Sequence, residues 1–247
     1  MMQSLKFICG AILALAGVWI SVPVSAAETE SRVVVELYTS QGCNSCPPAD
    51  DLLGKLNEQE GVIGLSLHVD YWDYIGWHDT FAFAETTERQ KAYVRTMSRR
   101  YVYTPQMVIN GRVQAIGSDR AAVEEGIAYV QDMHEPIGMT TTLDHGGHVI
   151  VRLDETEIES EAWLWLARYD KKKEVEVTRG ENQGKMLTYY NVVRDLDYLG
   201  MWDGKAKEIS LDMSALQAGG RDGCVIIAQR DGFGPILGAV VIDLDGS

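Results

Sequence analysis

The stretch VELYTSQGCNSCPPAD, residues 35–50, decides the fold. Its first residues belong to a run of β-branched and apolar side chains over residues 32–38, which is typical of a buried strand. Beyond the loop, leucines recur at helical spacing over residues 47–58. Cys43 and Cys46 lie at this junction. The stretch therefore predicts a strand followed by a helix, with a C-x-x-C pair where the helix begins.

The C-x-x-C pair predicts thiol–disulfide chemistry. In the first turn of a helix, two intervening residues put the sulfurs within disulfide reach, and the helix dipole stabilises a thiolate on the outer cysteine. We expect Cys43 to be the attacking thiol and Cys46 the resolving thiol, closer to the core. Pro47 and Pro48 favour a helix that begins near Cys46, with Ser45 as its N-cap. Because both prolines lack an N–H donor, Cys43 is expected to be less acidic than the thiol of a strong oxidant.

Two other interpretations of the pair stay open. It can form a structural disulfide in a non-catalytic binding module, although so tight a loop constrains the unfolded chain less than a long one. It can also bind copper or another metal ion with His68 or His78, which lie in an unusually aromatic loop at residues 68–79. Structural zinc usually needs four ligands, and the sequence has no second C-x-x-C pair. The redox interpretation, which needs no metal ion or organic cofactor, is therefore favoured.

The residues that follow continue the alternation of strands and helices. Strands are predicted at residues 62–69, 106–109 and 113–116, and helices at residues 85–100 and 119–133. Asn110-Gly111 is a hairpin turn signal between the last two strands. The C-x-x-C pair follows the first strand, and a Thr-Pro pair precedes the third. This order, with both landmarks in place, is that of a thioredoxin fold.

Thr104, Pro105 and Glu36 are the other candidate site residues. A proline that precedes an edge strand and faces the cysteines is cis in thioredoxin folds, where the backbone before it can bind an extended substrate peptide. An X-Pro peptide is usually trans, but the position after a polar helix favours cis here. Glu36 interrupts an apolar strand. It is either a buried acid, which in many thioredoxin-fold enzymes relays a proton to the resolving thiol, or an exposed residue at a strand edge.

The pattern changes at Pro136. The short apolar stretches that follow are typical of strands, and a lysine run at residues 171–173 is read as a bend. Residues 179–184 are expected to form a polar turn, and Cys224 an inert core thiol. The predicted fold class is an α/β thioredoxin-like domain over residues 27–135, followed by an all-β, sandwich-like domain over residues 136–247. The predicted strands of the second domain are residues 140–143, 148–153, 162–169, 174–178, 186–194, 208–211, 224–230 and 236–244.

Residues 1–26 are expected to be a signal peptide. Lys6 precedes an apolar run that Pro23 ends, and the small residues around Ala26 suit signal peptidase. The run is short for a membrane span, so we expect a periplasmic or secreted protein with no stable membrane insertion. The net charge of −14 argues against nucleic acids and anionic membrane surfaces as partners. The expected partners are protein thiols and disulfides, as substrates and as a redox partner.

Several stretches resemble a known family. They are similar to the secreted thioredoxin-like family catalogued as domain of unknown function 1223. The resemblance implies a thioredoxin-like domain with an appended β domain, and it supplies no substrate. Gly42 stands where an aromatic residue commonly precedes the first cysteine of thioredoxins. The stretches that carry the resemblance are VELYTSQGCNSCPPAD (35–50), HVDYWDYIGWHD (68–79), YTPQMVING (103–111), GEN (180–182) and NVVRDL (191–196).

Overall fold

A computed structural model of the chain describes residues 32–133 and 136–244. The predicted signal peptide, residues 1–26, lies outside the described residues. The first half of the described chain has the predicted order of elements. It consists of β1 (Val33–Thr39), α1 (Pro47–Leu56), β2 (Val62–His68), the short 3-10 helix η1 (Asp73–Ile75), α2 (Ala84–Thr96), β3 (Gln106–Ile109), β4 (Val113–Ile116) and α3 (Arg120–Met133).

The second half is mostly strands, and β7 and β8 are much longer than predicted. The predicted bend at residues 171–173 is wrong: β7 runs straight through it, because its pairing with β8 continues from Lys172 opposite Tyr190 to Glu176 opposite Met186. The elements are β5 (Met139–Leu143), β6 (His148–Leu153), β7 (Ala162–Glu176), β8 (Met186–Trp202), β9 (Lys207–Asp212), α4 (Met213–Leu216), β10 (Gly223–Arg230), the 3-10 helix η2 (Asp231–Phe233) and β11 (Ile236–Asp243).

The predicted fold class, an α/β thioredoxin-like domain followed by an all-β domain, is wrong. One mixed sheet of eight strands, in the order β11-β10-β7-β8-β2-β1-β3-β4, takes strands from both halves of the chain. The halves meet where β8 pairs in parallel with β2, at Val192 and Ser66. An unpaired outer edge of β2 would expose backbone donors and acceptors, and β8 covers it. The boundary at residue 136 stays a prediction, but the sheet crosses it.

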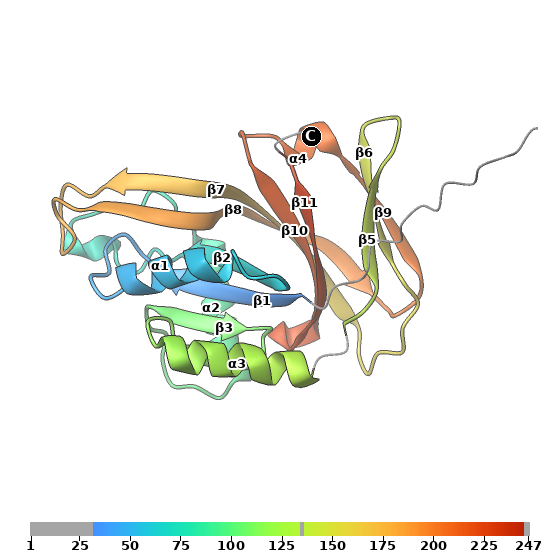
Figure 1. The fold of residues 1–247 in the computed structure, drawn as a ribbon, viewed down its shortest axis with the longest axis horizontal. Coiled ribbons are helices and arrows are strands. Elements are labelled where there is room, and N and C mark those ends of the chain that lie inside the picture. Colours follow the sequence, from blue (N-terminus) through green and yellow to red (C-terminus); the bar gives the residue numbers. More distant parts are fainter. Residues whose placement is uncertain (1–31, 134–135, 245–247) are drawn as a thin grey trace, which may run out of the picture.

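A second, three-stranded sheet covers only the C-terminal part of the large one. Its order is β5-β6-β9. Side chains of β6 such as Val151 pack with Leu164 of β7 and Ile226 of β10 in one core cluster. Figure 1 shows this small sheet beside β10 and β11, at the end of the molecule away from the N-terminal helices. The separate sandwich-like domain predicted for residues 136–247 is therefore wrong, because the large sheet that packs on β5-β6-β9 also contains strands of the N-terminal half.

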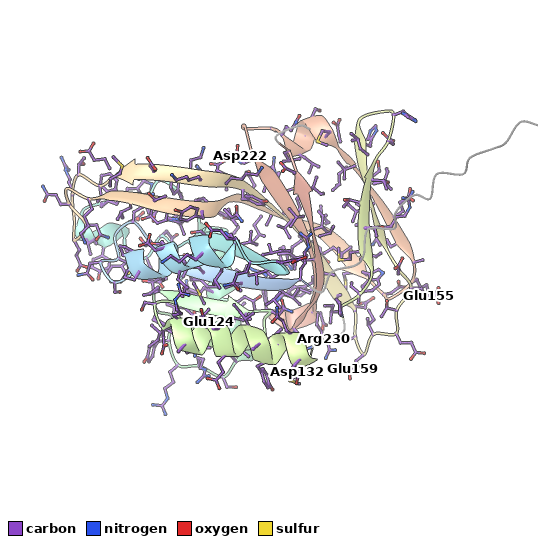
Figure 2. The ribbon with its side chains drawn as sticks, viewed as in Figure 1. Glu124, Asp132, Glu155, Glu159, Asp222 and Arg230 are labelled. Atoms are coloured by element: carbon purple, nitrogen blue, oxygen red, sulfur yellow. A yellow bond between two sulfur atoms is a disulfide. The ribbon has the colours of Figure 1, made fainter. Side chains whose placement is uncertain are left out.

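The helices divide between the two faces of the N-terminal strands. Leu53 of α1 and Val123 of α3 share a core cluster with Leu37 of β1, whereas Tyr93 of α2 shares another with Tyr38. Successive residues of a strand point to opposite faces, so α1 and α3 cover one face and α2 covers the other. Side chains fill the space between these layers (Figure 2). In the described part of the chain, no helix has the length and apolar character needed to cross a membrane.

Candidate functional site

The two cysteines form a disulfide where α1 begins. The Cα atoms of Cys43 and Cys46 are 5.5 Å apart. The predicted N-cap, Ser45, is displaced by one residue: Cys46 is the N-cap and the two prolines occupy the first helical positions. Both cysteines have 0% exposed surface, although Asn44 and Ser45 between them are exposed. The predicted outer position of Cys43 is therefore covered in this conformation.

The loop between β7 and β8 lies against the disulfide. Asn182 is fully buried, and its side-chain N–H₂ donates to the backbone oxygens of Gln41 and Cys43, each at 2.9 Å. Lys185 donates to the Asn182 side-chain oxygen at 2.9 Å. Sequence patterns indicated only a polar turn at residues 179–184. In the structure, this turn holds the backbone around the first cysteine through the two hydrogen bonds of Asn182, and we call it the clamp.

Thr104 and Pro105 lie near the first turn of α1. Their peptide bond is cis, as expected. A Cβ added to Gly117 would lie 3.2 Å from Pro105 Cβ and 3.1 Å from Ala49 Cβ in the first turn of α1. The indole N–H of Trp72 donates to Thr104 Oγ1 at 2.8 Å. The same tryptophan packs against Gly42, because a Cβ there would lie 3.1 Å from Trp72 Cβ.

Glu36 is buried, but not beside the disulfide. Arg89 Nε donates to its Oε1 and the Tyr93 hydroxyl donates to its Oε2, each at 2.5 Å. Both partners come from α2, so the carboxylate lies on the face opposite α1. Burial lowers the pKa of the Arg89 guanidinium, but the Glu36 carboxylate and the neighbouring tyrosine hydroxyls together outweigh burial and raise it. The prediction of an exposed strand-edge residue is wrong, and the structure places Glu36 in a buried ion pair.

A different buried carboxyl group lies one helical turn after Cys46. Asp50 is 3% exposed, and its Oδ1 has no hydrogen-bond partner among the described residues. Burial raises the pKa of Asp50 well above its usual range; Thr39 beside it offsets part of this rise, and the charges of Asp51 and Asp79 add to it. The sequence held a signal for this residue, since Asp50 follows Cys46 by four positions and so falls on the same apolar face of α1.

His68 and Asp79 form a buried pair in the same region. His68 Nδ1 lies 2.8 Å from Asp79 Oδ2, which also accepts the backbone N–H of Gln41 at 2.7 Å. Burial raises the pKa of Asp79, but His68 and these backbone donors outweigh burial and hold it below its usual range. The ring of Tyr189 from β8 packs edge-on against His68, with centroids 4.5 Å apart. The charges of Asp50 and Asp79 add to the effect of burial in raising the pKa of Tyr189.

The histidines predicted as alternative metal ligands are held by carboxylates. His78 Nδ1 lies 2.5 Å from Asp73 Oδ2 at the surface, apart from the buried His68–Asp79 pair. Within residues 32–133 and 136–244, no three His, Cys, Asp or Glu side chains are grouped so as to hold a metal ion. Cys224 is buried in β10, and burial raises the pKa of its thiol to about 12.

A comparison with protein-family models places the chain in one family. The family described as "Protein of unknown function (DUF1223)" matches residues 34–229. The chain is also similar to a protein of Agrobacterium tumefaciens solved by X-ray crystallography in a structural genomics programme. The two are 33% identical with a TM-score of 0.76, over 87% of this chain and 95% of that one. A search of curated proteins found no match. The chain is therefore a member of the DUF1223 family.

Proposed function

We propose that this protein is an exported thiol–disulfide oxidoreductase that acts through Cys43 and Cys46. The observation that carries the proposal is the Cys43–Cys46 disulfide at the start of α1. Ala49, in the first turn of this helix, and Pro105 both lie close to Gly117. A cysteine at a helix N-terminus gains stabilisation of its thiolate from the backbone. Because Pro47 and Pro48 remove two donors from that end, the pair suits a reductase or isomerase better than a primary oxidant.

We further propose a relationship between residues 33–133 and the thioredoxin superfamily. The local strand order β2-β1-β3-β4, the C-x-x-C pair after β1 and the proline before β3 support it. In this chain the same sheet continues into β8, so the relationship concerns the N-terminal strands and not a separate domain. Fold likeness alone does not carry an activity, and the cysteines carry the proposal.

The proposed reaction is a two-step exchange with a protein disulfide. The Cys43 thiolate attacks one sulfur of the client, forming a mixed disulfide and releasing the other client sulfur as a thiolate. The Cys46 thiolate then attacks Cys43, which re-forms the Cys43–Cys46 disulfide and releases the second client thiol. The client gains two electrons and the enzyme loses two. A dithiol protein must therefore return two electrons to the enzyme before the next turnover.

The absence of exposed surface on both cysteines favours a second candidate function, a binding protein with a structural disulfide. The reduction potential of the Cys43–Cys46 pair separates the two. A structural disulfide of a secreted protein typically has a potential below about −300 mV, whereas known exchange proteins lie at roughly −120 to −270 mV. A potential of roughly −120 to −270 mV supports the oxidoreductase, and a potential below about −300 mV overturns it.

Trapping tests the named roles of the two thiols. Cys46→Ser should accumulate mixed disulfides through Cys43 with a disulfide-bonded test protein, and Cys43→Ser should accumulate far fewer. Cys224→Ala is the matched control, because it removes the other cysteine of the described chain without touching the pair. If Cys46→Ser yields no mixed disulfide while the parent reduces the same protein, the assignment of Cys43 as attacking thiol is wrong.

Export is tested on the mature protein. The proposal predicts a periplasmic or secreted protein whose first residue is Ala27 or Glu28, since residues 1–26 read as a signal peptide. N-terminal sequencing of the protein from a periplasmic or culture fraction measures this directly. A chain that keeps residues 1–26 in the cytoplasm would overturn the proposed location.

A further inference from the structure

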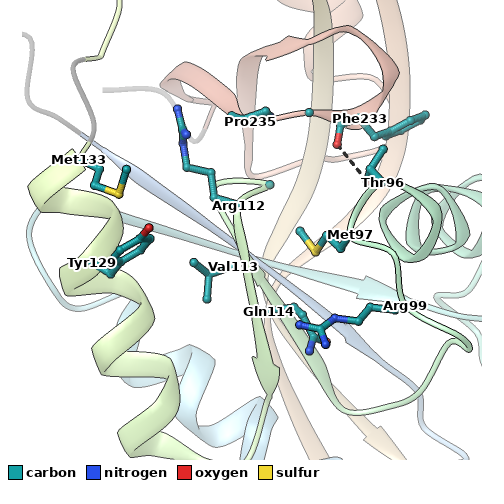
Figure 3. A pocket seen from close by; sticks show the side chains of 12 residues that line it. Thr96, Met97, Arg99, Arg112, Val113, Gln114, Tyr129, Met133, Phe233 and Pro235 are labelled. Atoms are coloured by element: carbon teal, nitrogen blue, oxygen red, sulfur yellow. Dashed lines mark hydrogen bonds between the residues drawn. The ribbon is translucent and has the colours of Figure 1, made fainter.

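The edge strand β4 lies at the bottom of a groove, at the end of the eight-stranded sheet away from β11. A cavity of about 590 Å³ lies over it, between the C-terminal half of α3 and the residues that follow α2. Figure 3 shows Val113 and Gln114 of β4 in the middle, Tyr129 and Met133 on one side and Arg99 on the other. A second hollow of about 320 Å³ continues the groove past Gln114 to Arg100 and Tyr101.

The arginines of this groove are unlike most others in the chain. Arg99, Arg100 and Arg112 are exposed, and none forms an ion pair within the described residues. The protein has 36 acidic against 22 basic residues, so carboxylates are in excess. Three unpaired guanidinium groups beside one strand therefore form a local positive site on a negative molecule. Seven other arginines do pair with a carboxylate, namely Arg89, Arg120, Arg152, Arg168, Arg194, Arg221 and Arg230.

The two walls of the groove differ in chemistry. The α3 wall is apolar, with Tyr129 54% and Met133 52% exposed. The opposite wall carries Arg99, Arg100 and Tyr101, and the described residues that line both hollows include no aspartate or glutamate. A strand added to a sheet edge sends alternate side chains to opposite faces. The groove thus offers an apolar contact to one set of side chains and a basic contact to the other.

We propose that β4 binds an extended peptide in which acidic and apolar residues alternate, as an added strand of the sheet. Edge strands pair with such peptides through their unused backbone groups, and the flanking side chains select the sequence. Carboxylates on one side of the peptide meet Arg99 and Arg100, and apolar side chains on the other meet Tyr129 and Met133. Arg112, beside the start of β4, meets a carboxylate at one end of the peptide. The proposal is independent of the disulfide chemistry.

The test uses a fluorescein-labelled octapeptide that alternates Glu and Val, with binding followed by anisotropy at low salt. We expect it to bind at least tenfold more tightly than an octapeptide alternating Lys and Val. A peptide of the same composition with four Glu followed by four Val should bind several-fold more weakly. In hydrogen exchange, bound peptide should protect amides of residues 113–116, which an ionic contact alone would leave unchanged.

Two double variants test the residues. Arg99→Gln with Arg112→Gln should weaken binding at least tenfold, whereas Arg120→Gln with Arg152→Gln, an equal loss of charge elsewhere, should change it less than twofold. Circular dichroism confirms that each variant is folded. Equal losses in both variants, or equal binding of the alternating and block peptides, would overturn the proposal. So would concentration-dependent dimerisation that the Arg99/Arg112 variant abolishes, because the occupant of the edge would then be a second copy of this chain.

Discussion

Opposite faces of β1 each adjoin a buried carboxyl group, and the two groups are paired very differently. On the α2 face, both oxygens of Glu36 accept hydrogen bonds, and Gln229 of β10 donates to Tyr93 in the same network. On the α1 face, Asp50 keeps one oxygen without a partner among the described residues. A fully paired buried charge ties elements together, whereas an unpaired carboxyl group is driven toward its neutral form.

The disulfide lies at the start of α1, the helix that carries Asp50, so the two carboxyl groups differ in how close they are to it. The sequence directed attention to Glu36 as a proton relay, yet the structure places it opposite α1, in an ion pair that links β1, α2 and β10. Asp50 lies four residues after Cys46 and holds the raised pKa. If the comparison is right, Glu36 governs stability, while changes around Asp50 and Asn182 alter the behaviour of the disulfide.

Glu36→Gln should have the largest effect. It leaves Arg89 buried without its countercharge, so we expect a loss of about 3–5 kcal/mol in the free energy of unfolding. Urea denaturation followed by circular dichroism measures it. Glu88→Gln is the control, since Glu88 forms an exposed pair with Lys91 and should cost less than about 1 kcal/mol. A stable Glu36→Gln protein with slowed thiol exchange would reverse the comparison.

Asn182→Ala should open the cover of the disulfide. The buried carbonyl groups of Gln41 and Cys43 each lose one donor, which costs about 1–3 kcal/mol. We expect dithiothreitol to reduce the disulfide faster, by on the order of tenfold, because lowering an activation barrier by about 1.4 kcal/mol raises the rate tenfold. Gln183→Ala, an exposed change in the same loop, should react at the parent rate. An unchanged rate in Asn182→Ala would show that the clamp does not limit access.

Asp50→Asn should change the pH dependence of stability. The raised pKa of Asp50 in the folded state stabilises the protein below the unfolded value, near pH 4, and this contribution is lost as pH rises through the folded value. Asparagine does not ionise, so the variant does not lose this stability as pH rises. Its free energy of unfolding should match that of the parent near pH 4 and exceed it at pH 8. Each unit of pKa shift contributes about 1.4 kcal/mol. Unfolding free energies from pH 4 to 8 measure this, with exposed Asp51→Asn as a control that should keep the parent's profile.

The hydrogen bond between Trp72 and Thr104 should have the smallest effect. Trp72→Phe and Thr104→Val each remove one partner, and the double variant removes both. A double-mutant cycle on unfolding free energies should give a coupling of about 0.5–1.5 kcal/mol. Zero coupling would mean that packing, and not this hydrogen bond, holds the tryptophan in place.

Local patterns predicted the elements better than their assembly. The strand at residues 106–109, the hairpin turn at Asn110-Gly111 and the helix predicted at residues 119–133 all carry their signals within a few residues. In the structure Asp119 accepts from Ala122 N at 3.2 Å at the start of that helix. The partner of β2 does not, because pairing with β8 joins residues more than 120 positions apart. The lysine run at residues 171–173 gave a wrong bend for a related reason. These half-buried and exposed side chains lie within β7, whose pairing with β8 continues through them.

The candidate site divides in the same way. The C-x-x-C pair lies where α1 begins, and the Thr104–Pro105 peptide bond is cis, as local patterns predicted. Asn182 was out of reach, since a short polar turn offers no sign of what it will contact. Asp50 was within reach, because a carboxylate on the apolar face of a helix is itself a signal.

The clamp residue Asn182 is synthesised well after the two cysteines. Asn182 lies 139 residues after Cys43, and a ribosome adds roughly 5–20 residues per second. Both cysteines therefore exist for on the order of ten seconds before the residue that covers them has been made. An oxidant that reached the nascent chain in this interval would meet both thiols before the Asn182 contacts exist. The mature protein encloses a bond that was easiest to make before the second half of the chain was translated.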